Sequence, residues 1–123
     1  MFSGIITHIG KIKSISKKND NCIIEISTKM KFGKHDIGSS ISCSGVCLTL
    51  ERHHKKIANF YLSKETLNRT IFKKTIKGDI INLEKSIKFG NRLSGHFVQG
   101  HIDITSKILK INHLGKSRLI NFK

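Results

Sequence analysis

The sequence predicts an all-β fold: a small antiparallel, Greek-key-like closed barrel with one short helix, followed by an incomplete second barrel repeat. Three observations predict this fold. Apolar residues fall in short alternating runs between turn-forming residues, a single segment has helical character, and the opening of the chain recurs near its end. With 123 residues, the chain is long enough for one such barrel core and part of another.

An internal repeat sets the predicted domain organisation. Residues 98–108 resemble residues 2–12, and placing Gly4 on Gly100 gives an offset of 96 residues (100 less 4). The same offset aligns three more identical pairs: Ile6 with Ile102, Lys11 with Lys107 and Ile12 with Ile108. An offset of this size corresponds to a small domain and is far too long for a solenoid repeat.

We therefore expect a first barrel at residues 1–94 and the first strands of a second, truncated barrel at residues 95–123. Residues 85–95 have the composition of a linker between the two. Only 23 residues follow Gly100 (123 less 100), which is too few to bury a core of their own. The strand edges of this second part would be exposed unless a partner covers them.

The elements of the first barrel follow from short local patterns. Residues 46–51 alternate between apolar and polar side chains, which is typical of a half-buried strand. Further strands are expected at residues 22–27, 58–62 and 80–84, and in the second part at 117–122. Turn-forming residues separate the segments at 18–21, 31–34, 53–56, 77–79 and 90–91. The one helix is expected at residues 63–69, with Ser63 as its N-cap and without a capping box.

The net charge of +15 raises nucleic acid or an anionic membrane surface as a partner. The composition offers another explanation, because lysine outnumbers arginine 19 to 4, isoleucine reaches 21 residues and proline is absent. Such a bias is typical of an AT-rich coding sequence. The lysines are scattered, and arginine, the better reader of phosphates and bases, is scarce. We therefore expect no nucleic-acid partner and keep a basic nucleic-acid-binding barrel as the less favoured alternative.

The sequence also predicts no transmembrane helix and no membrane partner, since its longest apolar runs are three residues. The opening residues lack the basic and apolar regions of a signal peptide. Three cysteines, an odd number, fit a reducing compartment better than a disulfide framework. These observations predict a cytoplasmic protein.

Three clusters contain residue types that could carry chemistry. In the first, residues 42–49, an extended strand would place Cys47 and Thr49 on the same side, opposite the apolar residues. A thiol beside a hydroxyl could line a polar pocket, although a cysteine in a half-buried strand is also an ordinary small apolar residue. Cys43 and Cys47 are spaced as metal ligands, but no second spaced pair follows, so we expect no metal site.

The second cluster, residues 95–101, contains His96 and His101, each preceded by a glycine that would let a ligand approach closely. Imidazole groups transfer protons near neutral pH, but two exposed linker histidines would show the same spacing. The third cluster, residues 61–67, offers polar side chains and helix N–H groups to the carbonyl or hydroxyl groups of a ligand. Its alternative is an ordinary solvated surface helix.

Taken together, five stretches resemble riboflavin synthase of the alpha-chain type, a family built from two similar barrels. They are residues 1–6, 43–49, 64–70, 81–84 and 95–103. The resemblance runs from Met1 to about Lys110 with the order and spacing of that family. It agrees with the internal repeat, which was found independently of it.

This resemblance implies an enzyme, a transferase that needs no metal or organic cofactor. The family dismutates two molecules of 6,7-dimethyl-8-ribityllumazine to riboflavin and 5-amino-6-(ribitylamino)uracil, the last step of riboflavin biosynthesis. It forms a homotrimer in which each site lies between the first barrel of one subunit and the second barrel of its neighbour. Because much of the second barrel has no counterpart in this chain, the alternatives are a homodimer and a lumazine- or flavin-binding module without turnover.

The resemblance also implies which residues form the site. Four stretches match ligand-contacting positions: Gly4, Ile5 and Ile6; Cys47, Leu48 and Thr49; Tyr61, Leu62, Ser63, Lys64, Glu65 and Thr66; and Gly100, His101 and Ile102. His101 is the first candidate for proton transfer, and His96 is the second. Cys47 is the candidate for polarising the ring or adding to it.

Overall fold

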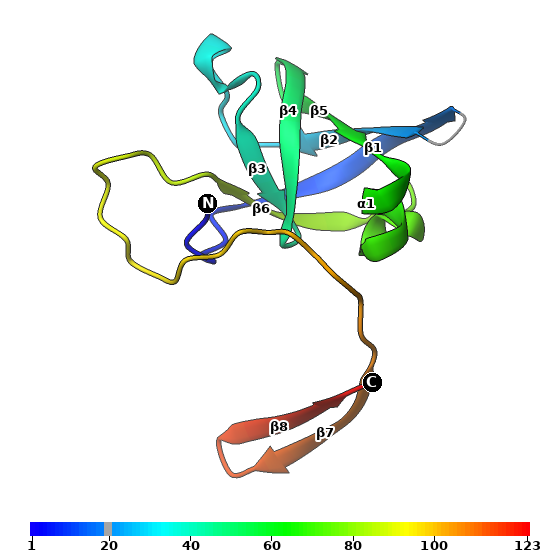
Figure 1. Ribbon diagram of the computed structural model, residues 1–123, viewed down its shortest axis with the longest axis vertical. Coiled ribbons are helices and arrows are strands. Elements are labelled where there is room, and N and C mark those ends of the chain that lie inside the picture. The colour runs from blue at the N-terminus through cyan, green and yellow to red at the C-terminus, as the bar shows by residue number, and fades with distance from the viewer. Residues whose placement is uncertain (19–20) are drawn as a thin grey trace.

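The computed structural model describes residues 1–18 and 21–123, and in them a closed barrel of six antiparallel strands forms the main body (Figure 1). The strands are β1 (His8–Lys18), β2 (Asn21–Thr28), β3 (Ser40–Cys43), β4 (Val46–His54), β5 (Ile57–Leu62) and β6 (Ile80–Lys85). Around the barrel they follow the order β1-β2-β5-β4-β3-β6, and β6 closes on β1. Because β2 pairs with β5 and not with β3, strands β2 to β5 form a Greek key, as predicted.

Helix α1 (Lys64–Arg69) follows β5 directly, where the sequence predicts it. Ser63 is its N-cap, because the Ser63 Oγ accepts a hydrogen bond from the Thr66 N–H at 3.1 Å. Two short 3-10 helices, η1 (Lys34–Asp36) and η2 (Ile71–Lys73), lie in the connections. Over residues 1–18 and 21–123, no helix is long and apolar enough to cross a bilayer.

The barrel core confirms the predicted alternation in β4. The side chains of Val46, Leu48 and Leu50 are buried, whereas Cys47 is half-buried and Thr49 is exposed. The other strands add further buried side chains: Ile12, Cys22, Ile24, Ile26, Ile41, Cys43, Ala58, Phe60, Leu62, Ile81 and Leu83. Each fully buried Ile, Leu or Phe contributes about 1.5–3 kcal/mol to folding, so this cluster is the main source of barrel stability.

The described structure differs from the sequence prediction at one strand and at one turn. Strand β3 was not predicted. Its four residues do alternate between polar and apolar types, but the run has the minimum length for that signal, and Ile41, Ser42 and Cys43 are all buried. The turn expected at 53–56 begins later than predicted, since β4 continues through His54. The turn expected at 18–21 includes residues 19 and 20, which lie outside the described residues.

The last two strands, β7 (Ile108–Leu114) and β8 (Ser117–Phe122), form a separate two-stranded sheet that lies apart from the barrel in Figure 1. Their register repeats that of β1 and β2. The pairs Ile12–Ile26, Ile15–Ile24 and Lys17–Cys22 of the first hairpin become Ile108–Phe122, Ile111–Ile120 and His113–Arg118 when 96 is added to each number. The irregularity between Ile12 and Ser14 also recurs, between Ile108 and Lys110. The second sheet is therefore consistent with an incomplete second barrel.

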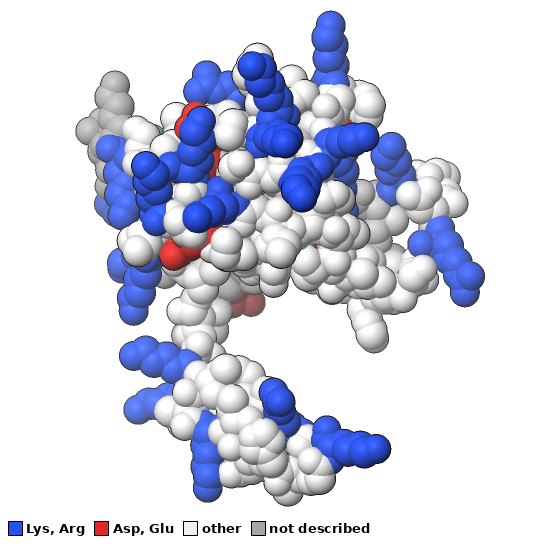
Figure 2. All heavy atoms as spheres, turned by 180° about the vertical axis from the view of Figure 1, so that it is seen from behind, with Lys and Arg blue, Asp and Glu red and all other residues white. Residues whose placement is uncertain are grey.

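Positive charge is spread over the face of the molecule seen in Figure 2. Figure 2 shows Lys and Arg side chains across the visible face of the barrel and on the hairpin, with few acidic side chains between them. A nucleic-acid groove would gather its cations along one track. The distribution supports the compositional interpretation of the charge.

Candidate functional site

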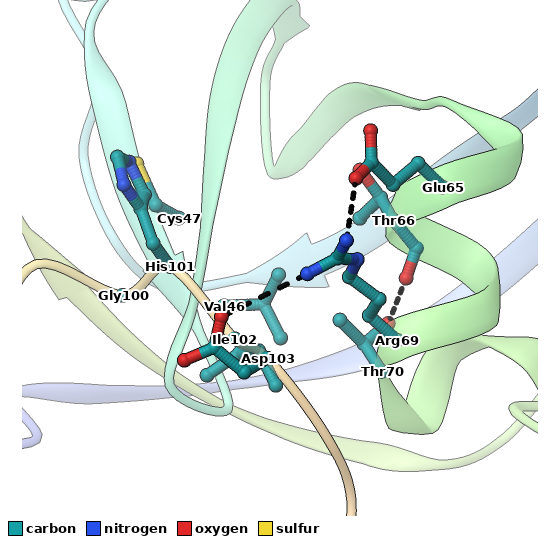
Figure 3. Close-up of a pocket in the computed structure, with 10 residues that line it drawn as sticks. All are labelled: Val46, Cys47, Glu65, Thr66, Arg69, Thr70, Gly100, His101, Ile102 and Asp103. Carbon is teal, nitrogen blue, oxygen red and sulfur yellow. Dashed lines mark hydrogen bonds and ion pairs between the residues drawn. The ribbon is translucent and has the colours of Figure 1, made fainter.

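A pocket of about 320 Å³ lies between helix α1, the start of strand β4 and residues 100–103 (Figure 3). Its lining combines apolar, hydroxyl, thiol, imidazole and charged side chains. The residues are Val46, Cys47, Glu65, Thr66, Arg69, Thr70, Gly100, His101, Ile102 and Asp103.

One wall of the pocket comes from residues 95–103, which we call the docked segment. Residues 2–6, which we call the N-terminal arm, hold it through backbone hydrogen bonds. Phe2 and Val98 each donate an N–H to the carbonyl of the other, at 2.7 and 3.0 Å, and the His96 N–H donates to the Ser3 carbonyl at 2.9 Å. The docked segment therefore lies against the first barrel, before the chain continues to β7.

The docked segment also contacts β4 directly, and this contact requires a glycine. The Cys47 N–H donates to the Gly100 carbonyl at 2.9 Å. Gly100 has a φ of +79°, and a side chain there would place its Cβ 3.0 Å from the Cys47 Cβ and 3.0 Å from the Cys47 nitrogen. Glycine is therefore needed both for the backbone conformation and for the close approach.

This contact brings a thiol and an imidazole to one side of the pocket. Cys47 and His101 both line the pocket, and in Figure 3 their side chains overlap in projection at the edge of the pocket away from α1, while Arg69 extends from α1 toward Asp103. Cys47 is half-buried on β4 and His101 is exposed on the docked segment. The pocket lining thus includes a nucleophile or polarising group and a proton-transfer group.

Among the cysteines, burial separates Cys47 from the other two. Burial raises the pKa of the Cys43 thiol far above its ordinary value, and the neighbouring Cys47 raises it further. Burial also raises the pKa of Cys22, with a smaller opposing effect from Lys17. Cys22 and Cys43 are therefore inert core thiols, and Cys47 is the cysteine that lines the pocket.

The opposite side of the pocket carries a short chain of ion pairs. The Arg69 Nη2 lies 3.1 Å from Glu65 Oε1, one helical turn earlier, and the Arg69 Nη1 lies 3.7 Å from Asp103 Oδ1. The side chains are 49%, 73% and 95% exposed, respectively. Such exposed pairs contribute about 0.2–1 kcal/mol each, so they orient the docked segment near α1 more than they stabilise it.

The structure brings six of the predicted ligand-contacting residues into this pocket: Cys47, Glu65, Thr66, Gly100, His101 and Ile102. It places the others outside the lining: Gly4, Ile5, Ile6, Leu48, Thr49, Tyr61, Leu62, Ser63, Lys64 and, of the catalytic candidates, His96. Leu48 and Leu62 belong to the barrel core, and Thr49 and Tyr61 are exposed on the sheet. The ligand contacts and catalytic roles of these residues stay predictions.

The N-terminal arm faces a different part of the molecule. Ile5 lines a separate hollow of about 620 Å³ together with Met30, Glu84 and Ile87. Gly4, Ile5 and Ile6 are exposed. A single pocket that contains all four predicted ligand stretches is therefore not formed by the described residues of one chain.

Four residues of the pocket were missed by the sequence interpretation: Val46, Arg69, Thr70 and Asp103. The spacing of Glu65 and Arg69, four residues apart in a predicted helix, was a usable signal for an ion pair. No sequence signal pointed to Asp103, because its ion pair with Arg69 forms only when residues 95–103 dock on the barrel. The Thr70 hydroxyl donates to the Thr66 carbonyl at 2.7 Å and accepts from the Phe72 N–H at 3.3 Å, so it links α1 to η2.

The described residues contain no cluster that could hold a metal ion. Across residues 1–18 and 21–123, no group of three or more His, Cys, Asp or Glu side chains is arranged to hold a metal ion.

Comparisons with known proteins agree on one family. Residues 3–86 match the lumazine-binding domain. The chain is 39% identical to riboflavin synthase of Buchnera aphidicola subsp. Baizongia pistaciae (strain Bp) over 109 residues, 88% of this chain and 51% of that protein. It is 37% identical to riboflavin synthase of Brucella abortus (strain 2308) over 115 residues, 89% of this chain and 57% of that protein. The chain thus spans about half the length of the curated relatives it matches.

Solved structures give the same likeness. The crystal structure of LumP complexed with 6,7-dimethyl-8-(1'-D-ribityl) lumazine matches with a TM-score of 0.78 and 26% identity, over 100% of this chain and 68% of that one. The structure of LumP complexed with riboflavin matches with the same TM-score and identity, over 100% of this chain and 67% of that one.

Proposed function

Because the chain belongs to the lumazine-binding domain family, we propose that it binds 6,7-dimethyl-8-ribityllumazine in the pocket between α1 and the docked segment, and that it acts in the riboflavin synthase reaction. The observation that carries the proposal is the convergence of Cys47, Glu65 and His101 in one pocket. These residues come from three separate stretches of the chain, and each matches a ligand-contacting position of riboflavin synthase.

The proposed reaction dismutates two molecules of 6,7-dimethyl-8-ribityllumazine to riboflavin and 5-amino-6-(ribitylamino)uracil. A proton must leave an acidic methyl group on one lumazine, and His101 is the group that we assign to this transfer. Cys47, on the same side of the pocket, would polarise the ring or add to it. The hydroxyl of Thr66 and the carboxylate of Glu65 would hold hydroxyl groups of the ribityl chain.

Two lumazines must stack for turnover, because the correct relative orientation of the rings supplies much of the rate. The 96-residue offset places Gly4, Ile5 and Ile6 of the N-terminal arm in correspondence with Gly100, His101 and Ile102 of the docked segment. The docked segment forms one wall of the pocket on the first barrel. We propose that the arm forms the equivalent wall of a pocket on a second barrel. Under this proposal residues 1–94 form the first lumazine-binding barrel and residues 95–123 open the second, with residues 95–103 docked back on the first.

A second candidate function is binding of lumazine or flavin without turnover. The observation that favours it is the structural similarity of the chain to LumP. The solved LumP structures are complexes of that protein with lumazine, riboflavin or flavin mononucleotide. A single pocket of this chain could hold one ring without bringing two rings together.

The proposed partners are the lumazine substrate, the riboflavin product and further copies of the chain. For the full-length family we propose a homotrimer, and for this chain alone a homodimer. The hairpin β7–β8 supports self-association, because its large apolar side chains are 40–62% exposed, from Ile120 (40%) to Leu109 (62%). Exposed apolar strands with free edges are prone to pair with another chain.

One experiment separates the two functions. The lumazine is added to the purified chain, and riboflavin formation and quenching of lumazine fluorescence are followed in the same sample. Riboflavin formation supports the enzyme, and quenching without riboflavin supports the binding module. If neither signal appears at millimolar lumazine, the pocket does not bind lumazine and both proposals are wrong.

A further inference from the structure

A buried carboxylate outside the pocket holds the N-terminal arm. Glu84, near the end of β6, is only 4% exposed. Its Oε1 accepts hydrogen bonds from the Ser3 N–H and the Ser3 Oγ, both at 2.6 Å, and its Oε2 accepts from the Gly4 N–H at 3.1 Å. Three donors from two consecutive residues thus converge on one carboxylate. Hydrogen bonds to an ionised acceptor are about twice as strong as neutral ones.

The same Ser3 that Glu84 holds also holds the docked segment. Its carbonyl accepts the His96 N–H at 2.9 Å, next to the reciprocal hydrogen bonds of Phe2 and Val98. A Cβ added to Gly95 would clash with the Ser3 carbonyl oxygen, so the two backbones are in close contact here. The position of Ser3 therefore helps to set where the N-terminal end of the docked segment lies on the barrel.

The docked segment in turn places the imidazole of the pocket. From His96 it continues to Gly100, whose carbonyl accepts the Cys47 N–H, and then to His101. His101 is exposed, so its side chain has little packing of its own to hold it. Its position depends on the backbone contacts on its N-terminal side, together with the packing of Ile102 against the core and the Arg69–Asp103 ion pair on its C-terminal side.

We propose that Glu84 is a positioning residue of the pocket: by fixing Ser3 it holds the docked segment on the barrel and keeps His101 beside Cys47. Glu84 does not line the pocket around Cys47 and His101, so it acts through Ser3 and the docked segment. The effect of Glu84 on ligand binding rests on the proposed function, whereas its effect on the docked segment does not.

The chemistry of the site requires a carboxylate. Both oxygens of Glu84 accept hydrogen bonds, and all of the donors come from the arm. A glutamine of the same shape would offer one acceptor oxygen and one NH₂ group. The NH₂ group would face either the Ser3 donors or the Gly4 N–H, so the hydrogen bonds at that oxygen position would be lost.

The test compares Glu84→Gln with the unmodified chain by amide hydrogen exchange and by fluorescence titration with 6,7-dimethyl-8-ribityllumazine. We expect the exchange of the His96, Val98 and Cys47 amides to accelerate about tenfold or more, while the core amides of β2 and β5 keep their rates. Lumazine affinity should fall by about tenfold or more, because the lost interaction is charge-assisted.

Matched variants separate positioning from general destabilisation. Glu51→Gln makes the same chemical change on an exposed strand residue and should alter neither readout. Ser3→Ala removes one donor to Glu84 and should loosen the same amides, whereas Ser3→Thr keeps the hydroxyl and should restore them. Because Ser3 lies outside the barrel strands, its variants decide the question even if Glu84→Gln unfolds the barrel.

The outcomes distinguish the two proposals. If the unmodified chain does not bind lumazine, the proposed function is wrong, and the amide exchange of the variants still decides the role of Glu84. Unchanged exchange of the His96, Val98 and Cys47 amides in both Glu84→Gln and Ser3→Ala would overturn the positioning role. Loss of lumazine affinity without faster exchange would overturn it as well.

Discussion

Phe2 and Val98, which are equivalent residues of the 96-residue repeat (98 less 2), hydrogen-bond to each other in both directions. The Phe2 N–H donates to the Val98 carbonyl at 2.7 Å, and the Val98 N–H donates to the Phe2 carbonyl at 3.0 Å. The two reciprocal hydrogen bonds form an isolated antiparallel bridge, and it joins equivalent positions of the repeat. Through this bridge the docked segment is held beside the arm, and its residues 100–103 form one wall of the pocket.

The first prediction tests the close approach at Gly100. Gly100→Ala should strain a left-handed backbone by about 1–2 kcal/mol and also push the docked segment away from Cys47. Gly38→Ala is a matched control, because Gly38 has a similar φ of +82° with no atom within 4 Å of the added Cβ. We expect both variants to lose stability in urea unfolding, Gly100→Ala at least as much as Gly38→Ala, and Gly100→Ala alone to lose lumazine affinity. Equal lumazine affinity in the two variants would contradict the role of this contact.

The second prediction concerns thiol reactivity. Iodoacetamide should modify Cys47 in the folded chain, because Cys47 is half-buried at the pocket, and leave Cys22 and Cys43 unmodified, since burial raises the pKa of both. Bound lumazine should slow the modification of Cys47. Mass spectrometry of the digested protein measures both effects. Modification of Cys43 as fast as Cys47 without unfolding would show that the core thiol is accessible.

A third prediction follows from the ion pair between Asp36 and Lys85. Burial by itself raises the pKa of Asp36, but hydrogen bonds from the Lys85 Nζ and the Gly33 N–H outweigh it and hold the pKa below its ordinary value. A depressed carboxyl pKa contributes stability above the unfolded pKa of about 3.9, and this stability is lost as the pH falls through the folded pKa.

Asp36→Asn should therefore lower the free energy of unfolding at pH 7 by about 1.5–3 kcal/mol, the range for hydrogen bonds to charged groups. The difference from the unmodified chain should shrink as the pH falls below about 4. Urea unfolding between pH 3 and pH 7 measures it. Parallel stability curves for the two proteins over that range would show that the Asp36 carboxylate does not contribute in this way.

The fourth prediction concerns self-association through the hairpin. Replacing Ile120 and Phe122 of β8 with serine should weaken the proposed homodimer at least tenfold, because both side chains are large, apolar and exposed. Ile76→Ser changes an isoleucine that is 64% exposed beside the barrel and should have no effect on association. Light scattering over a concentration series measures the change. A chain that stays monomeric at high concentration before any substitution would disprove the homodimer.

The fifth prediction separates chemistry from folding at His101. His101→Ala should lower riboflavin formation by about 10²–10⁴-fold if the imidazole transfers the proton. Its effect on the free energy of unfolding should stay within about 0.5 kcal/mol, because the side chain is exposed. His96→Ala should have a smaller effect on the rate, since His96 lies outside the pocket lining. Equal losses in the two variants would remove the assignment of proton transfer to His101.

The sequence by itself determined the all-β class, the single helix, the repeat and the side of β4 on which Cys47 lies. These features are local, because the period of a strand or a helix determines which neighbouring side chains are apolar and which are polar. The repeat was visible for the same reason, since equivalent strands need similar side chains. The register of β7 and β8, with its irregularity at Ile108 and Lys110, confirms that similarity.

Only the tertiary structure decided which predicted site residues meet. The arm and the docked segment join through backbone N–H and carbonyl groups, as in the pairs Phe2–Val98 and Ser3–His96. Every residue except proline carries these groups, so such contacts leave almost no trace in side-chain patterns. Folding therefore separated Gly4, Ile5 and Ile6 from the pocket and brought His101 to Cys47. The identity of the residues was readable from the sequence, but their grouping depended on pairing between backbone segments that lie nearly a whole domain apart in the chain.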